Sequence, residues 1–333
     1  MIIRTKLINL ISRIFVSLNG DKLLRKVNRT PRVLFWHGID SKVQNDVEAE
    51  IIDVEVFEKQ IKYLNKYYEV ISIEEFEKRF LTNSFTNSEV VLTFDDGYAN
   101  NLYVVEPILN KYNLPYTVFI STEHIATGQY YPTSVNRIIV KGSGLKKISL
   151  PSQNISFSIE TENDINNTVD SISNLLKTLT LKRVREITND LINNVSKDKW
   201  LELQEKYNSV RPMNWDEVIE LSNRKNVTIG SHCKYHICCH DNQDLEEIER
   251  QILESKQIIE DKLKIECNYF AYPNGDFTNS SNAIVRQAGY KMGFSIQKEL
   301  SINNNNDLTV IPRIGVPQGI NTFKIFINIF PKR

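Results

Sequence analysis

The first segment with catalytic potential is a pair of adjacent carboxylates, Asp95 and Asp96. The pair follows the apolar run Val90–Phe94 and precedes Gly97. Like charges at the end of a buried strand destabilise each other, so a neighbouring cation would stabilise the pair. An exposed Asp-Gly turn is the alternative interpretation, and the pair by itself leaves both open.

The second segment contains two histidines, His232 and His236, directly after the apolar run Val227–Gly230. Imidazoles four residues apart can point to one place if the segment forms a helical turn. Two histidines and one carboxylate make a metal site with open coordination positions, which is typical of catalytic zinc. A structural zinc held partly by sulfur is the alternative, although the cysteines lack the usual knuckle spacing. They are Cys233, Cys238, Cys239 and Cys267.

Short apolar runs that are typical of buried strands position these residues. Patterns typical of helices separate most of the runs, and strands alternating with helices predict a parallel sheet, open or closed into a barrel. In a parallel barrel the carboxyl ends of the strands form one face, which carries the active site. His37, Tyr272 and Arg313 also fall at or near such ends. The predicted strands are Arg32–Trp36, Val90–Phe94, Tyr116–Ser121, Val227–Gly230, Tyr269–Tyr272, Met292–Ile296 and Leu308–Ile314.

One stretch, residues 127–211, interrupts this alternation and is rich in Asn, Ser, Lys and Thr. It contains a candidate hairpin, Lys147–Leu150 with Ile155–Ile159, and two helical patterns, Val169–Leu179 and Val184–Val195. We therefore expect an inserted α+β subdomain at 127–211. The barrel would then comprise 31–126 and 212–333.

The charge balance narrows the possible partners. The chain has 333 residues, with 41 Lys and Arg against 41 Asp and Glu. A general nucleic-acid-binding protein usually has a strong basic excess, so no nucleic-acid partner is expected. Four clustered cysteines are too few for a disulfide framework and indicate free thiols in a reducing compartment.

The N-terminal segment, residues 1–30, begins with a basic amphipathic pattern over residues 2–18. Asn9 and Arg13 interrupt its apolar residues, which argues against a membrane-spanning helix and against a signal peptide. Peripheral contact with an anionic membrane and packing against the chain's own domain both remain open. We expect a cytoplasmic protein, with the inner face of the membrane as its place of contact.

Five motifs give the chain a family resemblance. Residues 93–98 (TFDDGY) and 232–236 (HCKYH) resemble the T-F-D-D-G and His-(Ser/Thr)-x-x-His motifs of the polysaccharide deacetylase (NodB-homology, carbohydrate esterase family 4) family. Residues 270–275 (FAYPNG), 35–38 (FWHG) and 213–217 (MNWDE) resemble further elements in the family's order. The resemblance covers roughly 31–125 and 212–318.

The resemblance implies a deformed (β/α) barrel and a metal-dependent N-deacetylation. Carried onto this sequence, Asp96, His232 and His236 would bind the metal, with Zn²⁺ favoured, and Asp95 would be the general base. Oxyanion stabilisation would come from a backbone N–H near Tyr98 or Tyr272. We expect substrate contacts at the side chains that surround these positions, which are Tyr98, Tyr272, Pro273 and His124.

The sequence departs from the family pattern at the general acid. Many members use a late histidine, but no histidine follows His240 here. His37 is therefore the candidate acid, and His124 is a second candidate or a substrate contact. Ala271 stands near the place of the family's third-motif arginine, and Arg313 is the candidate replacement that pairs with Asp95.

The resemblance implies a hydrolase that removes an N-acetyl or N-formyl group from an amino sugar. Its partner would be an acylated glycan of a surface polysaccharide or a lipid-linked saccharide precursor. A non-catalytic carbohydrate-binding protein with a vestigial deacetylase site is the alternative. A nucleotide-sugar glycosyltransferase that uses the Asp pair for a divalent ion is a third possibility, but the histidine pair argues against it because Mg²⁺ and Mn²⁺ favour oxygen ligands.

Overall fold

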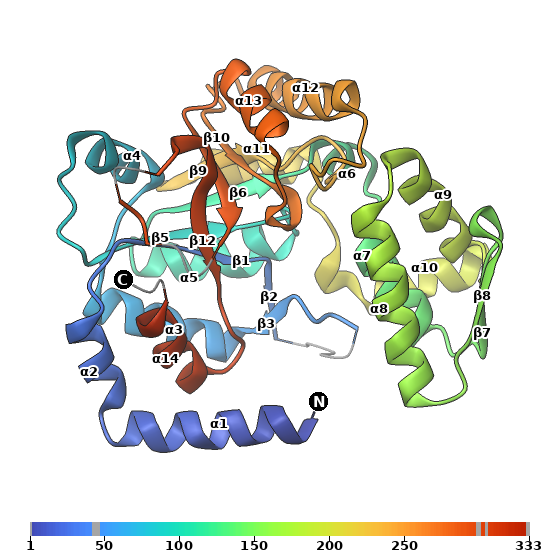
Figure 1. Ribbon diagram of the computed structural model, residues 1–333, viewed down its shortest axis with the longest axis horizontal. Coiled ribbons are helices and arrows are strands. Elements are labelled where there is room, and N and C mark those ends of the chain that lie inside the picture. Colours follow the sequence, from blue (N-terminus) through green and yellow to red (C-terminus); the bar gives the residue numbers. More distant parts are fainter. Residues whose placement is uncertain (1, 42–46, 298–300, 304–305, 331–333) are drawn as a thin grey trace.

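A closed barrel of parallel strands forms the centre of the computed structural model, which describes residues 2–41, 47–297, 301–303 and 306–330 (Figure 1). The strands run around the barrel in the order β1-β12-β11-β10-β9-β6-β5, and β1 also pairs with β5 to close it. All seven predicted strands are present, and the barrel expected from the sequence is confirmed. The strands are β1 (Arg32–Trp36), β5 (Glu89–Phe94), β6 (Tyr116–Ile120), β9 (Val227–Ser231), β10 (Tyr269–Ala271), β11 (Met292–Ile296) and β12 (Ile311–Gly315).

Alternation along the strands decides which side chains enter the barrel. Val33, Val91, Phe119, Phe294 and Ile311 belong to one buried cluster, whereas the intervening strand residues pack in the larger cluster with the surrounding helices. Successive strand residues point to opposite faces, so positions 37, 95 and 313 continue the inward set at the carboxyl ends. The predicted strand Leu308–Ile314 begins later than expected, because Leu308–Val310 forms a 3₁₀ turn.

Helices surround the barrel. Phe76 and Phe80 of α4 (Ile73–Thr82) belong to the same buried cluster as the inward-facing strand residues. The strand β4 (Glu69–Val70) pairs with the start of β5, and β2 (Gly38–Asp40) pairs with β3 (Ile51–Asp53). The surrounding helices are α3 (Val54–Tyr67), α4 (Ile73–Thr82), α5 (Glu106–Lys111), α6 (Thr122–Thr127), α11 (Trp215–Ser222), α12 (Leu245–Leu263), α13 (Asn279–Gln287) and α14 (Ile320–Ile329).

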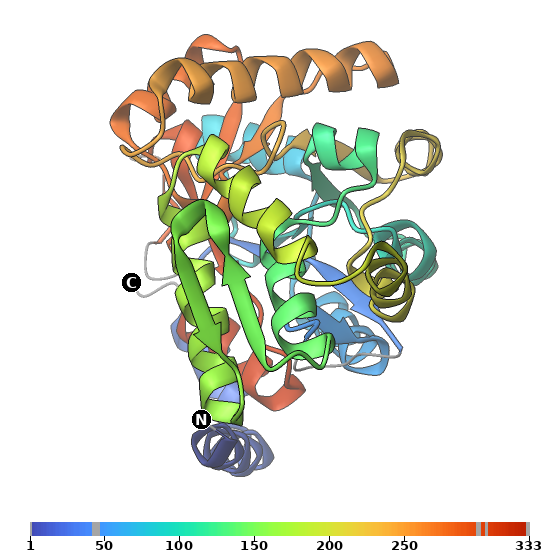
Figure 2. The same cartoon turned by 90° about the vertical axis from the view of Figure 1, so that its right-hand side faces the viewer.

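The stretch at 127–211 folds beside the barrel as a hairpin and four helices, drawn in green and yellow-green in Figures 1 and 2. The predicted hairpin is confirmed. The first long helix begins at Glu162, before the predicted Val169, because Thr161 and Asp164 form a reciprocal capping box. The exact limits of the insertion remain a prediction. Its elements are α7 (Pro132–Arg137), β7 (Lys147–Leu150), β8 (Ile155–Ser158), α8 (Glu162–Thr178), α9 (Leu181–Ile192) and α10 (Lys197–Lys206).

Two N-terminal helices, α1 (Ile2–Ser17) and α2 (Gly20–Val27), precede the barrel. Both contact α14, and α1 lies along the lower edge of the molecule in Figure 1. Within the described residues, no helix combines the length and apolar character needed to cross a membrane.

Candidate active site

Asp95 and Arg313 form an ion pair inside the carboxyl end of the barrel. The guanidinium Nη1 and Nη2 lie 2.7 and 2.8 Å from the two carboxylate oxygens, and both side chains are almost fully buried. Burial alone would raise the pKa of Asp95, but the charge and hydrogen bonds of Arg313 and the nearby histidines His232 and His37 together outweigh that effect and hold the pKa at about 2. Asp95 is therefore ionised at neutral pH, and the pairing expected from the sequence is present.

The chain turns sharply after Asp95, which presents the carboxylate of Asp96. Asp96 and Gly97 both adopt left-handed backbone conformations, with φ of 70° and 63°. A side chain at Gly97 would place its Cβ 2.7 Å from Ile120 Cγ2, so this position needs glycine. The hydroxyl of Tyr131 donates to the carbonyl oxygen of Asp96 at 2.5 Å. Close packing against Ile120 and the hydrogen bond from Tyr131 therefore fix the turn. Asp96 Oδ1 is buried without a hydrogen-bond partner.

His232 and His236 face that unpartnered oxygen. Their Nε2 atoms lie 3.7 and 3.3 Å from Asp96 Oδ1. His232 Nδ1 lies 2.7 Å from the carbonyl oxygen of Ala271. A carbonyl accepts only from a protonated nitrogen, so Nδ1 carries the proton and Nε2 of the neutral ring keeps its lone pair. This backbone partner orients the ring as a metal ligand requires.

The three side chains form the one group in the described part of the chain whose ligand atoms could hold a metal ion, all within 4.8 Å of one another. Burial raises the pKa of Asp96 to about 6 and lowers the pKa of His232 and His236 to about 4. A divalent cation would stabilise the charged carboxylate and the neutral imidazoles together. The donor set therefore fits a metal.

The alternative zinc site based on sulfur has no support in this geometry. All four cysteines are free and buried, and none belongs to the metal-ligand group. Cys233, at the Ser/Thr position of the histidine motif, is buried and has a left-handed backbone with φ of 61°. The loop is braced instead by Gln251 of α12, whose side-chain oxygen accepts from the Tyr235 N–H at 2.7 Å.

His37 lies at the edge of this group, directly after β1. It is half-buried, and its ring meets Phe35 edge-on with centroids 5.7 Å apart. Asn101 holds the segment by donating to the His37 carbonyl oxygen at 2.9 Å. After burial, the charge of His37 is the largest influence on the pKa of Asp96, which it lowers. The candidate acid His37 therefore interacts electrostatically with Asp96 of the metal-ligand group.

Glu50, which the sequence reasoning missed, links this edge to the insertion. Its carboxylate pairs with Arg137 of α7 at 2.9 Å and accepts from the Tyr98 hydroxyl at 3.1 Å. Arg137 also donates to the Val47 carbonyl oxygen at 3.0 Å. The Tyr98 side chain is fully buried, so it contributes to the site by packing inside the protein. No local pattern marks Glu50, because its partners come from distant parts of the chain.

His124 is connected to the metal-ligand group through the ring of Tyr131. It is fully buried, and its Nδ1 lies 2.7 Å from the Gln129 carbonyl oxygen. Its ring stacks on Tyr131 with centroids 4.1 Å apart, and Tyr131 in turn meets His236 edge-on at 5.2 Å. Burial lowers the pKa of His124 to about 3. This position corrects the expectation of an acid or substrate contact: the neutral ring supports Tyr131 and faces no solvent.

Tyr272 and Pro273 are also buried. The Tyr272 N–H donates to the Phe294 carbonyl oxygen at 2.9 Å, and its hydroxyl donates to Asn282 Oδ1 at 3.3 Å. The Tyr272 N–H is thus engaged in the sheet and cannot be the oxyanion donor. The backbone around Tyr98 pairs instead with residues 211–213. The Ala99 N–H donates to the Arg211 carbonyl oxygen, and the Met213 N–H donates to the Gly97 carbonyl oxygen. Tyr98 itself forms an isolated β-bridge with Pro212.

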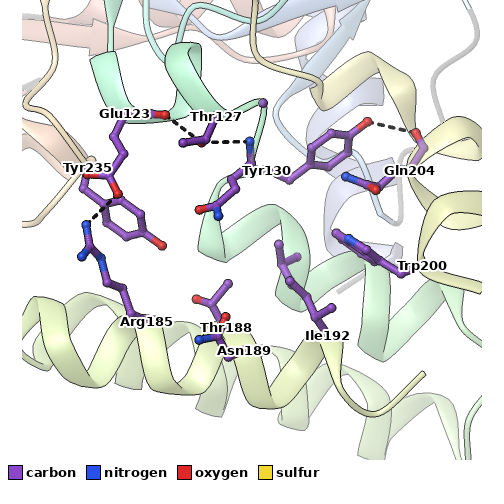
Figure 3. Close-up of a pocket in the computed structure, with 13 residues that line it drawn as sticks. Glu123, Thr127, Tyr130, Arg185, Thr188, Asn189, Ile192, Trp200, Gln204 and Tyr235 are labelled. Atoms are coloured by element: carbon purple, nitrogen blue, oxygen red, sulfur yellow. Dashed lines mark hydrogen bonds and ion pairs between the residues drawn. The ribbon is translucent and has the colours of Figure 1, made fainter. Parts of the chain in front are cut away.

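A cavity of about 420 Å³ lies between α6 and the inserted helices α9 and α10 (Figure 3). Trp200 and Tyr130 meet edge-on at its wall, with ring centroids 6.1 Å apart. Arg185 lies over the Tyr235 ring at 4.6 Å and pairs with Glu123 at 2.7 Å, so the cavity's one guanidinium and one carboxylate neutralise each other. The rest of the lining is largely amide, hydroxyl and aliphatic side chains.

Comparisons with known proteins identify the family of this chain and agree with its fold. Residues 82–293 match the family model described as polysaccharide deacetylase. No curated protein matches the chain. Among solved structures, the Streptococcus pyogenes deacetylase PplD aligns with a TM-score of 0.58 at 16% identity, covering 90% of this chain and 96% of its own. IcaB from Ammonifex degensii aligns with 0.57 at 14% identity, covering 90% and 96%. A de-N-acetylase from Aggregatibacter actinomycetemcomitans aligns with 0.53 at 15% identity, covering 89% and 98%.

Proposed function

The chain belongs to the polysaccharide deacetylase family, and we propose that it is a metal-dependent hydrolase that removes an N-acetyl or N-formyl group from an amino sugar. The substrate would be a surface polysaccharide or its lipid-linked precursor. The observation that carries this proposal is the Asp95–Arg313 pair beside the group of Asp96, His232 and His236. It supplies an ionised carboxylate next to a set of metal ligands with open positions.

Asp96, His232 and His236 would hold the metal, for which we favour Zn²⁺. When bound, such a metal polarises the amide carbonyl and makes water a better nucleophile. Asp95 accepts the proton of the attacking water, and Arg313 keeps Asp95 ionised and oriented for that step. The Tyr98 N–H stabilises the developing oxyanion.

His37 would donate the proton that the departing amine needs. Its support is its position after β1, at the same set of strand ends as Asp95 and His232. The family model begins at residue 82, so the roles of His37 and Arg313 rest on this chain's own geometry. A His37→Gln variant that keeps full activity would contradict the assignment of His37 as the general acid.

Metal content tests the proposal most directly. We expect about one equivalent of divalent metal in the wild type and in Asp95→Asn, and loss of that metal in His236→Ala. Acylated amino-sugar oligosaccharides would lose their acyl group only with the metal-bound wild type. Full metal retention in His236→Ala would contradict the site. Metal binding without acyl release from any acylated sugar would favour the alternative of a carbohydrate-binding protein with a vestigial site.

The cavity beside α9 and α10 would contact sugars next to the one that is cleaved. Trp200 offers an aromatic face, and Gln129, Asn189 and Gln204 offer amides. A Trp200→Ala variant should raise KM for an oligosaccharide roughly tenfold while kcat stays close to wild type. An unchanged KM would show that this cavity does not contact the oligosaccharide.

The sequence features of the N-terminus also predict where the enzyme works. A cytoplasmic location, with contact at the inner face of the membrane through residues 2–18, would suit a lipid-linked substrate. Cell fractionation tests this prediction, and recovery of the protein from the periplasm or the medium would contradict it.

A further inference from the structure

The N-terminal helices are fixed to the protein by polar and aromatic contacts. Arg25 of α2 donates to the Tyr63 hydroxyl at 2.8 Å and lies 3.9 Å from the centre of the Tyr67 ring. Tyr63 also donates to Asp21 at 3.2 Å. Ser12 of α1, only 5% exposed, lies on the packed side of that helix. Among the side chains that the structure describes, these polar and aromatic contacts link the two helices to the fold.

From Leu10 onward, where the structure describes the side chains of α1, most apolar side chains point away from the protein. Leu10, Ile11 and Ile14 are each more than half exposed, and Leu18, just beyond the helix, is 75% exposed. Leu10, Ile14 and Leu18 are spaced by four residues and therefore share one helix face. A helix of a globular protein normally buries its apolar face, whereas the described half of α1 exposes it.

The second helix repeats this arrangement. Leu23 and Val27 lie one turn apart and are 63% and 64% exposed, whereas Asp21 is 6% exposed. Among the described side chains of these two helices, most apolar ones thus face outward, and only Val16 and Leu24 are half-buried. Figures 1 and 2 show α1 at an edge of the molecule, where nothing in the described chain covers its outer side.

Positive charge surrounds these exposed apolar residues. Between residues 10 and 29 the sequence has five basic residues and a single acid, although the whole chain is balanced at 41 against 41. Arg13, Lys22 and Lys26 are exposed and form no ion pair with any residue that the structure describes. Apolar side chains flanked by unpaired lysines and arginines match the acyl and phosphate layers of an anionic bilayer.

We propose that α1 and α2 form a docking surface for anionic phospholipid membranes. The exposed leucines, isoleucines and valine enter the interfacial layer, and Arg13, Lys22 and Lys26 contact lipid phosphates. A second copy of the chain fits less well, because a two-fold dimer would place the same basic surface against itself. The docking extends the expected contact from residues 2–18 to α2 and does not depend on the chemistry of the active site.

Vesicle binding by the full chain tests the proposal. Vesicles of phosphatidylcholine alone are compared with vesicles of phosphatidylcholine and phosphatidylglycerol at 3:1. We expect at least tenfold tighter binding to the anionic vesicles, with weakening in 0.5 M salt. The triple variant Leu18→Ser, Leu23→Ser, Val27→Ser should lose at least tenfold, and so should Lys22→Gln with Lys26→Gln.

The matched control is Leu81→Ser with Leu201→Ser, two similarly exposed leucines elsewhere on the surface, which should bind within twofold of wild type. Equal binding of wild type and triple variant, or no preference for anionic vesicles, would overturn the proposal. So would a dimer that forms in solution and dissociates in the triple variant. All variants should keep wild-type activity on a soluble substrate, which separates failure of docking from failure of the proposed function.

Discussion

The carboxyl edge of the barrel and the N-terminal helices depart from ordinary globular packing in opposite ways. The barrel edge buries charge: Asp95, Asp96, Arg313 and His232 are all less than 5% exposed. The N-terminal helices expose apolar surface, with Leu18, Leu23 and Val27 all more than 60% exposed. Buried charges are costly unless they are paired, and a large exposed apolar patch usually marks an interaction site.

The comparison shows that each departure has a different physical compensation. At the barrel edge the compensation is internal, since Arg313 pairs with Asp95 and the histidine nitrogens face Asp96. At the N-terminal helices no compensation is present within the described chain. Substitutions at the barrel edge should therefore affect stability and activity, whereas substitutions on the exposed helix faces should affect neither.

The largest expected effect is on catalysis. Asp95→Asn removes the proposed proton acceptor, and activity should fall by about 10²–10⁴-fold. Metal content should stay at the wild-type level, because Asp95 is not among the proposed metal ligands. Asp198→Asn, at an exposed position of α10, is the control and should retain full activity. Activity within tenfold of wild type in Asp95→Asn would assign the base elsewhere.

The second largest effect is on stability, when the ion pair between Asp95 and Arg313 is broken. Arg313→Met leaves the Asp95 carboxylate buried and unpaired, which should lower the free energy of unfolding by about 3–5 kcal/mol at pH 7. Wild-type Asp95 has its pKa lowered to about 2, so the pair's contribution is present above the unfolded pKa and is lost as pH falls toward 2. The difference between variant and wild type should shrink over that range.

Denaturant titrations at pH 7 and pH 3 measure both parts of this prediction. Arg250→Met, at an exposed pair with Glu247, is the control and should change stability by about 0.5 kcal/mol or less. An Arg313→Met protein as stable as the wild type at pH 7 would show that Asp95 is not held by this pair.

The third effect is on the pH dependence of the free energy of unfolding. His124 is buried and its pKa is lowered to about 3, below that of an unfolded histidine. The unfolded chain therefore binds an extra proton between these values, so stability falls as pH decreases, by about 1.4 kcal/mol per pH unit. His124→Gln should remove that part of the slope between pH 6 and pH 4. An identical slope in both proteins would mean that His124 titrates normally.

The smallest effect belongs to the exposed helix face. Leu18→Ser should change the free energy of unfolding by about 0.5 kcal/mol or less, because little of its surface is buried. Leu92→Ala, a fully buried strand residue, should cost about 2–5 kcal/mol in the same assay. A large loss in Leu18→Ser would show that the side chain is packed in solution, and the contrast between the two regions would disappear.

Part of the active site was predictable from local sequence. Asp95, Asp96, His232 and His236 follow apolar strands directly, and parallel strands bring their carboxyl ends to one edge. Glu50, Tyr131 and Arg137 were not predictable in this way, because each acts through a partner far away in the chain. The same holds for His124 and Tyr272, whose residue types suggested substrate contacts until their burial was known.

The sequence by itself determined the barrel strands, the pattern of candidate metal ligands and the basic amphipathic character of the N-terminus. These follow from periodicity, from strand ends and from charge counts, which are local properties. Only the tertiary structure decided that Arg313 meets Asp95 and that the Tyr272 N–H is engaged in the sheet. It also decided that Leu18 and Leu23 face outward. Burial and pairing depend on which distant segments pack together, and no local pattern specifies that.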